Sequence, residues 1–247
     1  EGIRFRSPES IVYEIKKYKC DYNINYVWLF DELFMINEKR VFEVCEMFIK
    51  ENLNIKYFCT GRLDKVNTRI LDIMKRSGCV AIDYGIEQFD DVALKKMNKS
   101  LTTENIEEGI KMTLSKGIQP LFNIIFGNIG DTRETLRRSV DFLHKYNDYK
   151  QLRTIKPVTP YPGSPLYNYA VEKGLLKGPQ DFYERHKNVE LPTVNFTDIP
   201  DDEYIDLLFN INNEIISYYC KYIKEESIES FRKVYFEKDY SYRGPRH

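Results

Sequence analysis

The sequence predicts an α/β fold built on a parallel β-sheet. Short apolar runs alternate with amphipathic stretches over the first two thirds of the 247 residues, a pattern typical of successive strand–helix units. Five such runs recur at roughly 25–35-residue intervals, about the length of one βα unit. Right-handed crossovers between parallel strands follow from this order. Both an open doubly wound sheet and a closed or partial barrel satisfy the pattern.

The predicted strands are short and rich in apolar or aromatic residues. The first, NYVWLF, and the fourth, IQPLFNIIF, show this most clearly. Pro160 and Pro162 end the fifth strand, since proline has no N–H for the sheet. The five predicted strands are residues 25–30, 55–59, 80–85, 118–126 and 152–158.

The helices between the strands are marked by apolar residues three and four positions apart and by capping residues. Thr102 is a natural N-cap, and Gly78 and Gly117 are natural helix stops. Asp131 is expected to cap the next helix, with Glu134 three residues on, close to a capping box. The predicted helices are residues 38–51, a stretch ending near 78, residues 90–97 and 103–116, and a stretch beginning near 131.

The character of the sequence changes after Gly163. Residues 164–200 are loop-rich with one short helix, and residues 201–237 are strongly helical with a periodic apolar face. We therefore expect a core over residues 1–163 and a helical extension over residues 164–247. The extension is expected to cover the core or to bind a partner.

Composition excludes several classes of protein. A net charge of -1 gives no basic footprint for nucleic acid, and no apolar run is long enough for a membrane span. The five cysteines are odd in number and widely spaced, so they do not indicate a disulfide framework. A reducing, cytoplasmic location is expected. Without a signal peptide or an initiator Met, the chain is expected to be a piece of a longer protein.

Polar residues and glycines follow every predicted strand. The carboxyl ends of parallel strands meet at one rim, where active sites of such folds lie. A small polar ligand at this rim is therefore predicted, although any one of these residues is equally well explained as a cap or a solvated loop residue. Arg62, for example, has Asp64 and Asp83 as alternative surface partners. The rim residues are Asp31, Glu32, Thr60, Gly61, Arg62, Gly85, Glu87, Gly127, Asn128, Gly130, Thr159, Tyr161 and Gly163.

Six motifs, in this order and spacing, resemble the radical S-adenosylmethionine (SAM) superfamily, in the branch whose members often carry an upstream cobalamin-binding domain. The matched stretch runs from about residue 4 to residue 167. Each motif alone is weak, but their order is specific. The motifs are RSPE at residues 6–9, FDELF at 30–34, CTGRLD at 59–64, GIEQ at 85–88 with LKKMNK at 94–99, FGNIGDT at 126–132, and TPYPGSPLY at 159–167.

The resemblance implies a partial (β/α)6 barrel in which the strand at residues 25–30 is the family's second. It implies that SAM lies across the strand ends, with Asp31 and Glu32 near the methionine amino group. Arg62 is implied to face the ribose or the methionine. Thr60, in the same motif, is a further cofactor-binding candidate.

The resemblance places four more candidates on later strands. Glu87 is implied to face the ribose or methionine, and Lys99 to meet the SAM carboxylate. Asn123 matches a position that contacts adenosine, and Gly127 one that packs near the adenine. Lys99 has an alternative role as a solvated helix-end lysine, and Asn123 has one as a structural hydrogen-bonding residue.

One departure from the family pattern concerns its [4Fe–4S] cluster, which three cysteines in a CxxxCxxC loop hold. No such loop occurs in this chain. The first strand and the cluster loop are expected upstream of residue 1, and this stretch alone is expected to be inactive.

The resemblance implies an enzyme, either a methyltransferase or an oxidoreductase, that forms a 5′-deoxyadenosyl radical. Its cofactors would be SAM, the [4Fe–4S] cluster and, where a cobalamin domain precedes the barrel, cobalamin. The implied partners are a small-molecule or peptide substrate and an electron donor such as flavodoxin or ferredoxin. Two alternatives stay open: a cluster-free barrel that binds SAM or another nucleotide, and a non-catalytic interaction module or unrelated barrel.

Overall fold

The computed structural model describes residues 4–31, 34–149, 152–186, 188–219 and 221–238. The chain forms two compact units. Unit 1 is Glu1–Ile86 with Ser100–Phe122, and unit 2 is Glu87–Lys99 with Asn123–His247.

A five-stranded sheet is formed from all five predicted strands. Parallel pairing joins β1 to β2, β2 to β3 and β4 to β5. The predicted α/β class with a parallel sheet is therefore confirmed. The strands are β1 (Tyr26–Leu29), β2 (Lys56–Gly61), β3 (Cys79–Glu87), β4 (Gln119–Phe126) and β5 (Ile155–Pro157).

The strands occupy the sheet in the order of the sequence, β1-β2-β3-β4-β5. A doubly wound sheet reverses its strand order at a switch point. This sheet shows no reversal, so it is wound in one direction, as the sheets of (β/α) barrels are. The order thus selects barrel-type winding from the two arrangements that the spacing allows.

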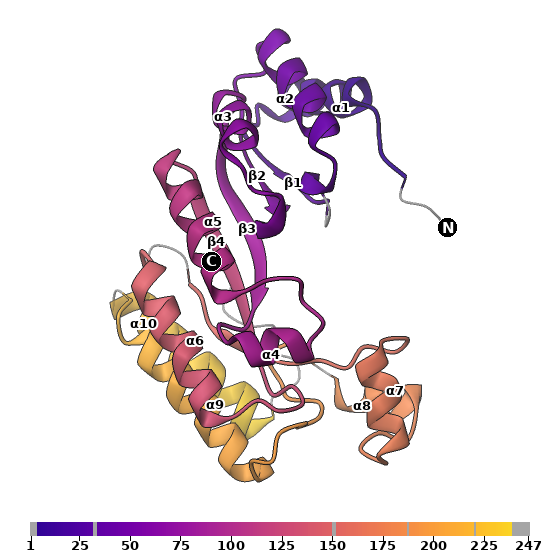
Figure 1. The fold of residues 1–247 in the computed structure, drawn as a ribbon, viewed down its shortest axis with the longest axis vertical. Helices are drawn as coiled ribbons and strands as arrows, with labels where there is room; N and C mark the ends of the chain where they lie inside the picture. The colour runs from indigo at the N-terminus through magenta and orange to yellow at the C-terminus, as the bar shows by residue number, and fades with distance from the viewer. Residues whose placement is uncertain (1–3, 32–33, 150–151, 187, 220, 239–247) are drawn as a thin grey trace. The chain divides into compact units, whose positions relative to one another are not determined.

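The described residues of unit 1 form four α-helices. In Figure 1, α1, α2 and α3 lie together, and α2 contacts both others. Helix α1 was not predicted, although Ser7 caps it and Pro8 occupies its first turn. Thr102 and Gly117 bound α5 as predicted. The helices are α1 (Pro8–Tyr22), α2 (Glu38–Lys50), α3 (Thr68–Arg76) and α5 (Thr103–Ser115), with short 3-10 turns at Phe34–Ile36 and Leu63–Lys65.

Unit 2 contains the remaining helices, and Figure 1 shows α6, α9 and α10 running alongside one another. The described residues between 201 and 237 are mostly helical, as predicted: α9 ends at Ile216, and a further helix begins at Lys221. The described residues of the loop-rich stretch after Gly163 form two helices, where one was predicted. The helices are α4 (Asp91–Lys96), α6 (Arg133–Tyr146), α7 (Pro165–Glu172), α8 (Pro179–Arg185), α9 (Asp201–Ile216) and α10 (Lys221–Arg232), with a π-helical turn at Lys233–Glu237.

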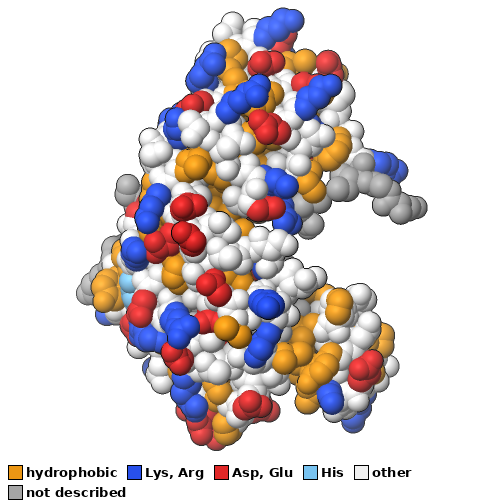
Figure 2. All heavy atoms as spheres, viewed as in Figure 1, with side chains coloured by type: hydrophobic (Ala, Val, Ile, Leu, Met, Phe, Trp, Pro, Cys, Tyr) orange, Lys and Arg blue, Asp and Glu red, His pale blue; other side chains and the backbone are white. Residues whose placement is uncertain are grey.

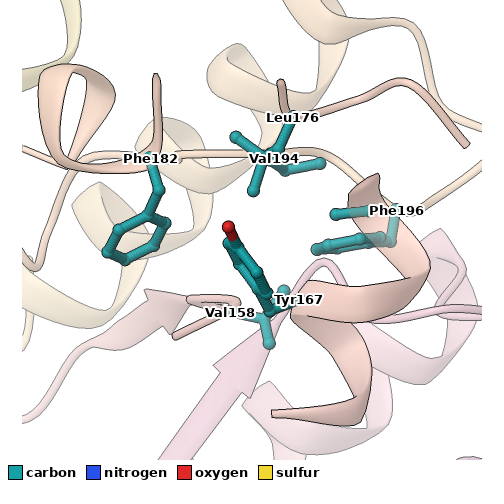
Figure 3. Close-up of a cluster of buried hydrophobic side chains, with 7 residues drawn as sticks. Val158, Tyr167, Leu176, Phe182, Val194 and Phe196 are labelled. Atoms are coloured by element: carbon teal, nitrogen blue, oxygen red, sulfur yellow. The ribbon is translucent and has the colours of Figure 1, made fainter. Parts of the chain in front are cut away.

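Helices α7 and α8 share a small hydrophobic core with the end of β5 (Figure 3). The rings of Tyr167 and Phe182 meet edge to face, with centroids 6.3 Å apart. This core ties the segment after Gly163 to the strand that precedes it. Its buried members are Val158, Tyr167, Ala170, Leu176, Phe182, Val194 and Phe196.

The surface seen in Figure 2 mixes basic and acidic side chains, while hydrophobic side chains gather over α7 and α8. Tyr183 and Val171 are among the exposed residues there, at 62% and 39% exposure. No described helix is both long enough and apolar enough to cross a bilayer.

Candidate functional site

Asp31, directly after β1, is held by two contacts inside unit 1. The hydroxyl of Thr60 on β2 donates a hydrogen bond to its main-chain carbonyl. Nη1 of Arg40, on α2, lies 3.3 Å from its Oδ2. Two of the predicted candidates, Asp31 and Thr60, are therefore in direct contact. Glu32, the neighbouring candidate, lies outside the described residues.

Arg40 contacts the candidate Asp31 and was not predicted from the sequence as a candidate. Arg40 is only 8% exposed. Its guanidinium lies over the rings of Phe5 and Phe34, 4.8 and 5.6 Å from their centroids. Such cation–π contacts restrict the plane of a guanidinium. The side chain is thus fixed where it orients the Asp31 carboxylate. The signal available in the sequence was an arginine four residues before Val44, which places it on the apolar face of the predicted helix.

A cavity of about 450 Å³ lies beside these residues in unit 1. Strand β1 forms one wall, and residues of α1 such as Ile11 and Tyr18 form another. Asp31 and Arg40 also line it. The cavity therefore follows the outermost strand of the sheet and reaches a predicted cofactor-binding residue.

Arg62 directs its guanidinium at a carboxylate of its own chain. Its Nε and Nη2 donate to the two oxygens of Asp64, over 2.9 and 3.2 Å. These hydrogen bonds raise the pKa of Arg62 above its ordinary value. This is the alternative partner considered from the sequence. Because the pair is exposed, it adds little stability and leaves Arg62 able to exchange one carboxylate for another.

Glu87 ends β3 and belongs to unit 2. Its φ of 70° is left-handed, which is uncommon for a residue with a side chain. Its Oε1 lies 3.0 Å from Nζ of Lys99. The predicted candidates Glu87 and Lys99 are therefore an ion pair at the end of a strand, and strained backbone of this kind is concentrated at functional sites.

The turn after Glu87 is tied to α6. The hydroxyl of Ser139 donates to Oε1 of Gln88 over 2.7 Å and accepts from the amide of Phe89 over 3.0 Å. Asp90, 4% exposed, caps α4 and pairs with Arg138. These contacts fix the backbone that holds the Glu87 carboxylate in place.

Asn123 lies in the middle of β4, where its neighbours Phe122 and Ile124 are buried. Successive strand residues point to opposite faces, so the exposed Asn123 faces away from the side on which these neighbours pack. It shares that face with Ile125, two residues closer to the carboxyl end of the strand.

Gly127, directly after β4, is enclosed by unit 2 itself. Its φ is 108°, and a Cβ at this position would lie 2.2 Å from the hydroxyl of Tyr204 on α9. That hydroxyl donates to the carbonyl of Phe126 over 2.9 Å, and the two rings stack with centroids 5.6 Å apart. The approach of Tyr204 therefore explains the glycine, and the predicted packing of Gly127 near an adenine stays a prediction.

Removing the Tyr204 hydroxyl should weaken unit 2. We expect Tyr204→Phe to lower the free energy of unfolding by about 1 kcal/mol, because a buried hydrogen bond is lost while Phe126 keeps a second donor. That donor is the amide of Val158, 2.9 Å away. Tyr146→Phe is the matched control: its buried hydroxyl has no hydrogen-bond partner among the described residues, so its loss should cost nothing. Urea unfolding of both variants checks this, and equal losses would contradict it.

Asp131 does not cap α6, which corrects the expectation from the sequence. Thr132 is the N-cap and forms a capping box with Thr135. Asp131 instead accepts hydrogen bonds from the amides of Gly127 and Asn128, over 3.0 and 2.9 Å. Its carboxylate therefore closes the glycine-containing loop after β4.

Asp131 gives a pH dependence of stability. Burial raises the pKa of its carboxyl above 3.8, more than the hydrogen bonds from Asn128 and Gly127 lower it. The Asp131 carboxyl therefore binds its proton more tightly in the folded state than in the unfolded state. As the pH falls from the raised pKa of the folded state to the ordinary pKa of the unfolded state, this proton binding increasingly stabilises the fold. We expect the stability of the wild type relative to Asp131→Asn to increase as pH falls from neutral towards about 4. Thermal unfolding of both proteins across that range measures it, and a constant difference would contradict it.

The predicted candidates form two groups. Asp31, Thr60 and Arg62 belong to unit 1, and Glu87, Lys99, Asn123 and Gly127 belong to unit 2. Within the described part of the chain, no three His, Cys, Asp or Glu side chains are grouped so as to hold a metal ion. Unit 1 offers a carboxylate, a hydroxyl and guanidinium groups, and unit 2 offers a carboxylate–ammonium pair and an amide; each set by itself suits a polar or charged small molecule.

Residues 1–143 match the family model described as "Radical SAM superfamily". An uncharacterized methyltransferase of Pyrococcus horikoshii, PH0819, is 30% identical over 178 residues, which are 71% of this chain and 38% of the relative. The anaerobic magnesium-protoporphyrin IX monomethyl ester cyclase of Rubrivivax gelatinosus is 25% identical over 172 residues, 69% of this chain and 31% of the relative. The chain thus spans only about a third of the length of these relatives.

Two solved structures share the fold. The radical SAM methyltransferase TsrM of Kitasatospora setae, with cobalamin and a [4Fe–4S] cluster bound, matches with a TM-score of 0.60 and 17% identity, over 70% of this chain and 36% of that one. The cobalamin-dependent SAM radical enzyme OxsB, with aqua-cobalamin and SAM bound, matches with a TM-score of 0.51 and 20% identity, over 73% of this chain and 27% of that one.

Proposed function

Because the chain belongs to the radical SAM superfamily, we propose that it is the SAM-binding barrel core of a radical SAM enzyme, formed by residues 1–163 and followed by a helical extension over residues 164–247. The proposal rests mainly on the placement of the candidates after successive strands of a parallel sheet wound in one direction. Ligands of parallel α/β folds bind at this end of the strands.

The charges of the candidates suit the charges of SAM. The carboxylate of Asp31, oriented by Arg40, suits the ammonium of the methionine, and Glu32 is proposed beside it. Lys99 suits the methionine carboxylate. Arg62 and Glu87 suit the hydroxyl-bearing ribose or the methionine.

The remaining candidates are uncharged. Asn123 offers both a donor and an acceptor to the adenosine. Thr60 fixes the backbone of Asp31, and Gly127 is proposed beside the adenine. In this proposal the barrel orients SAM and excludes water, while the cofactors supply the radical chemistry.

The described cysteines do not fit a [4Fe–4S] cluster, whose ligands are thiolates. Cys45, Cys59 and Cys79 are buried, and only Cys20 is exposed. Burial raises the pKa of the Cys45 thiol to about 11, so it keeps its proton at neutral pH. We therefore assign no step to these residues and propose that an upstream CxxxCxxC loop holds the cluster.

We propose that the cluster ligands lie on a strand that adds to β1. Strand β1 ends the sheet, so its outer edge has no partner strand among the described residues. The apolar cavity of about 450 Å³ follows this edge. Trp28 and Phe30, which line it, are 49% and 77% exposed. An open edge with exposed aromatic side chains is suited to receive a further strand.

We propose methyl transfer with cobalamin as the reaction of the whole protein. Support comes from the relatives, one of which is named a methyltransferase, and from the shared fold of two cobalamin-containing enzymes. The cobalamin domain would belong to the part of the protein that the chain does not span. A one-electron donor such as flavodoxin or ferredoxin, a small-molecule or peptide substrate, and a cytoplasmic location complete the proposal.

The test is anaerobic reconstitution of the full-length protein with iron and sulfide, followed by incubation with SAM and a reductant. We expect 5′-deoxyadenosine or a methylated product, measured by liquid chromatography. A protein that binds SAM without iron and never cleaves it would instead be a cluster-free SAM-binding barrel. A protein that does not bind SAM would reject both functions.

Glu87→Gln should weaken SAM binding about tenfold, the usual scale for a lost charged hydrogen bond. Calorimetry on the reconstituted protein measures the affinity. Glu229→Gln is the matched control, because Glu229 also pairs with a lysine of unit 2, Lys233, at 3.8 Å. Glu229→Gln should leave the affinity for SAM unchanged. If both variants bound SAM equally well, Glu87 would not be a SAM-binding residue.

A further inference from the structure

Lys156 is a charged residue in the middle of the short strand β5. Its neighbours Ile155 and Pro157 are buried, whereas its own side chain is 45% exposed. Ile155 lies against α9. The side chain of Asn212 on this helix accepts a hydrogen bond from the N–H of Ile155 and donates one to the carbonyl of Ile155. Because strand side chains alternate, Lys156 points to the other face of the sheet.

The register of β4 and β5 places Lys156 beside a predicted site residue. Lys156 is the partner of Ile125 on β4. Neighbouring residues of parallel strands have their side chains on the same face, and so do residues two apart in one strand. Lys156 therefore shares a face with Ile125 and Asn123, and it lies one residue from the carboxyl end of its strand.

Within the part of the chain that the structure describes, the ammonium of Lys156 pairs with Glu190, whose Oε1 lies 3.3 Å from Nζ. Glu190 is only 8% exposed, and its Oε2 has no hydrogen-bond donor among the described residues. A carboxylate buried in this way needs a cation nearby. The ion pair with Glu190 therefore limits the directions in which the Lys156 side chain can point.

This arrangement leaves hydrogen-bonding capacity at the exposed side of the ammonium. An ammonium has three donors, and one carboxylate oxygen uses one of them. Two donors therefore remain, on a side chain whose register partner on β4 is the apolar Ile125. A half-exposed lysine whose orientation is fixed by a buried glutamate is thus suited to bind an anion.

We propose that Lys156, positioned by Glu190, binds an anionic oxygen group, a carboxylate or phosphate, of the molecule that occupies the site in unit 2. The inference rests on the proposed function for the identity of that site. Two molecules supply this chemistry, the methionine carboxylate of SAM and an acidic group of the substrate.

Acetylation of lysines in the full-length protein, followed by mass spectrometry, tests the proposal directly. We expect Lys156 to react at least about threefold more slowly in the presence of the anion it binds, because the bound group covers its nucleophilic nitrogen. Lys233, which pairs with an exposed glutamate on α10, is the control and should react at an unchanged rate. The probes are inorganic phosphate, acetate, SAM, and decarboxylated SAM.

The probes distinguish the two sources. Protection by SAM but not by decarboxylated SAM assigns Lys156 to the methionine carboxylate. If phosphate or acetate still protects Lys156 when decarboxylated SAM is bound, Lys156 is assigned to an acidic group of the substrate. The absence of protection by every probe would overturn the proposal.

Variants give the second measurement. Lys156→Gln should raise the dissociation constant of the protecting anion about tenfold, and Lys156→Arg should restore most of the affinity because it keeps the charge. Lys233→Gln should have no effect. An unchanged affinity in Lys156→Gln would reject the assignment. Protection of Lys156 without any SAM cleavage would reject the proposed function but support the anion site. SAM cleavage without protection of Lys156 would support the proposed function but reject the anion site.

Discussion

Replacing Gly127 by alanine is expected to lower the free energy of unfolding by about 2–5 kcal/mol, the sum of a strained backbone and an overpacked contact. The residue has a φ of 108°, and the new methyl would lie 2.2 Å from the hydroxyl and 2.9 Å from the ring carbon that carries it on Tyr204. Tyr204 is 1% exposed, so its ring has no free space to move into. Chemical denaturation measures the change.

Gly163→Ala separates the two contributions at Gly127. Gly163 has a similar φ of 92°, but a Cβ there would meet nothing within 4 Å. It should therefore show the backbone cost alone, about 1–2 kcal/mol. In addition, Tyr204→Phe in the Gly127→Ala background should destabilise less than it does alone, because it removes the closest clashing atom. Equal losses in Gly127→Ala and Gly163→Ala would show that Tyr204 does not constrain this position.

Gly78→Ala is the second change with a large expected effect, about 3–5 kcal/mol. Gly78 follows α3 with a φ of 106°, and a Cβ would lie 2.2 Å from the carbonyl oxygen of Ile55. That oxygen belongs to the backbone just before β2, which cannot rotate away as a side chain can. The variant should unfold at clearly lower temperature, as circular dichroism would show.

Gly117→Ala is the control for Gly78. Gly117 ends α5 in the same unit, with a φ of 64°, and the nearest atom to a new Cβ is Nζ of Lys75, 3.4 Å away at the end of a flexible side chain. About 1–2 kcal/mol of strain is expected there. If the two variants were equally stable, the Ile55 carbonyl would not be the obstacle that the structure indicates.

The elements that could be predicted from the sequence are those with local signals. The five strands were recognisable from short apolar runs, and α5 from Thr102 and Gly117 at its ends. Helix α1 lacks a strong apolar stripe, since only Val12 and Ile15 are buried in it. The break between α9 and α10 carries no proline or glycine, so the sequence indicates a helical region there without locating the boundary between the two helices.

The candidate site could be predicted only as a set of strand ends. Asp131 and Thr132 are adjacent polar residues, and either suits an N-cap; the amides of Gly127 and Asn128 decide which one is used. The contact of Tyr204 with Phe126 joins residues 78 positions apart. No local pattern encodes such a contact, because it depends on how the chain packs after the helices have formed.

The amide of Asn212 has a consequence for how this protein behaves in concentrated solution. By occupying both main-chain groups of Ile155, it stops a foreign polypeptide from hydrogen-bonding at that residue of the last strand. The strand at the opposite edge of the sheet, β1 (Tyr26–Leu29), has no side chain bonded to its outer main-chain groups in this way in the described part of the chain. When no further strand occupies that edge, unwanted polymerisation should therefore begin there, and Trp28→Lys should suppress it.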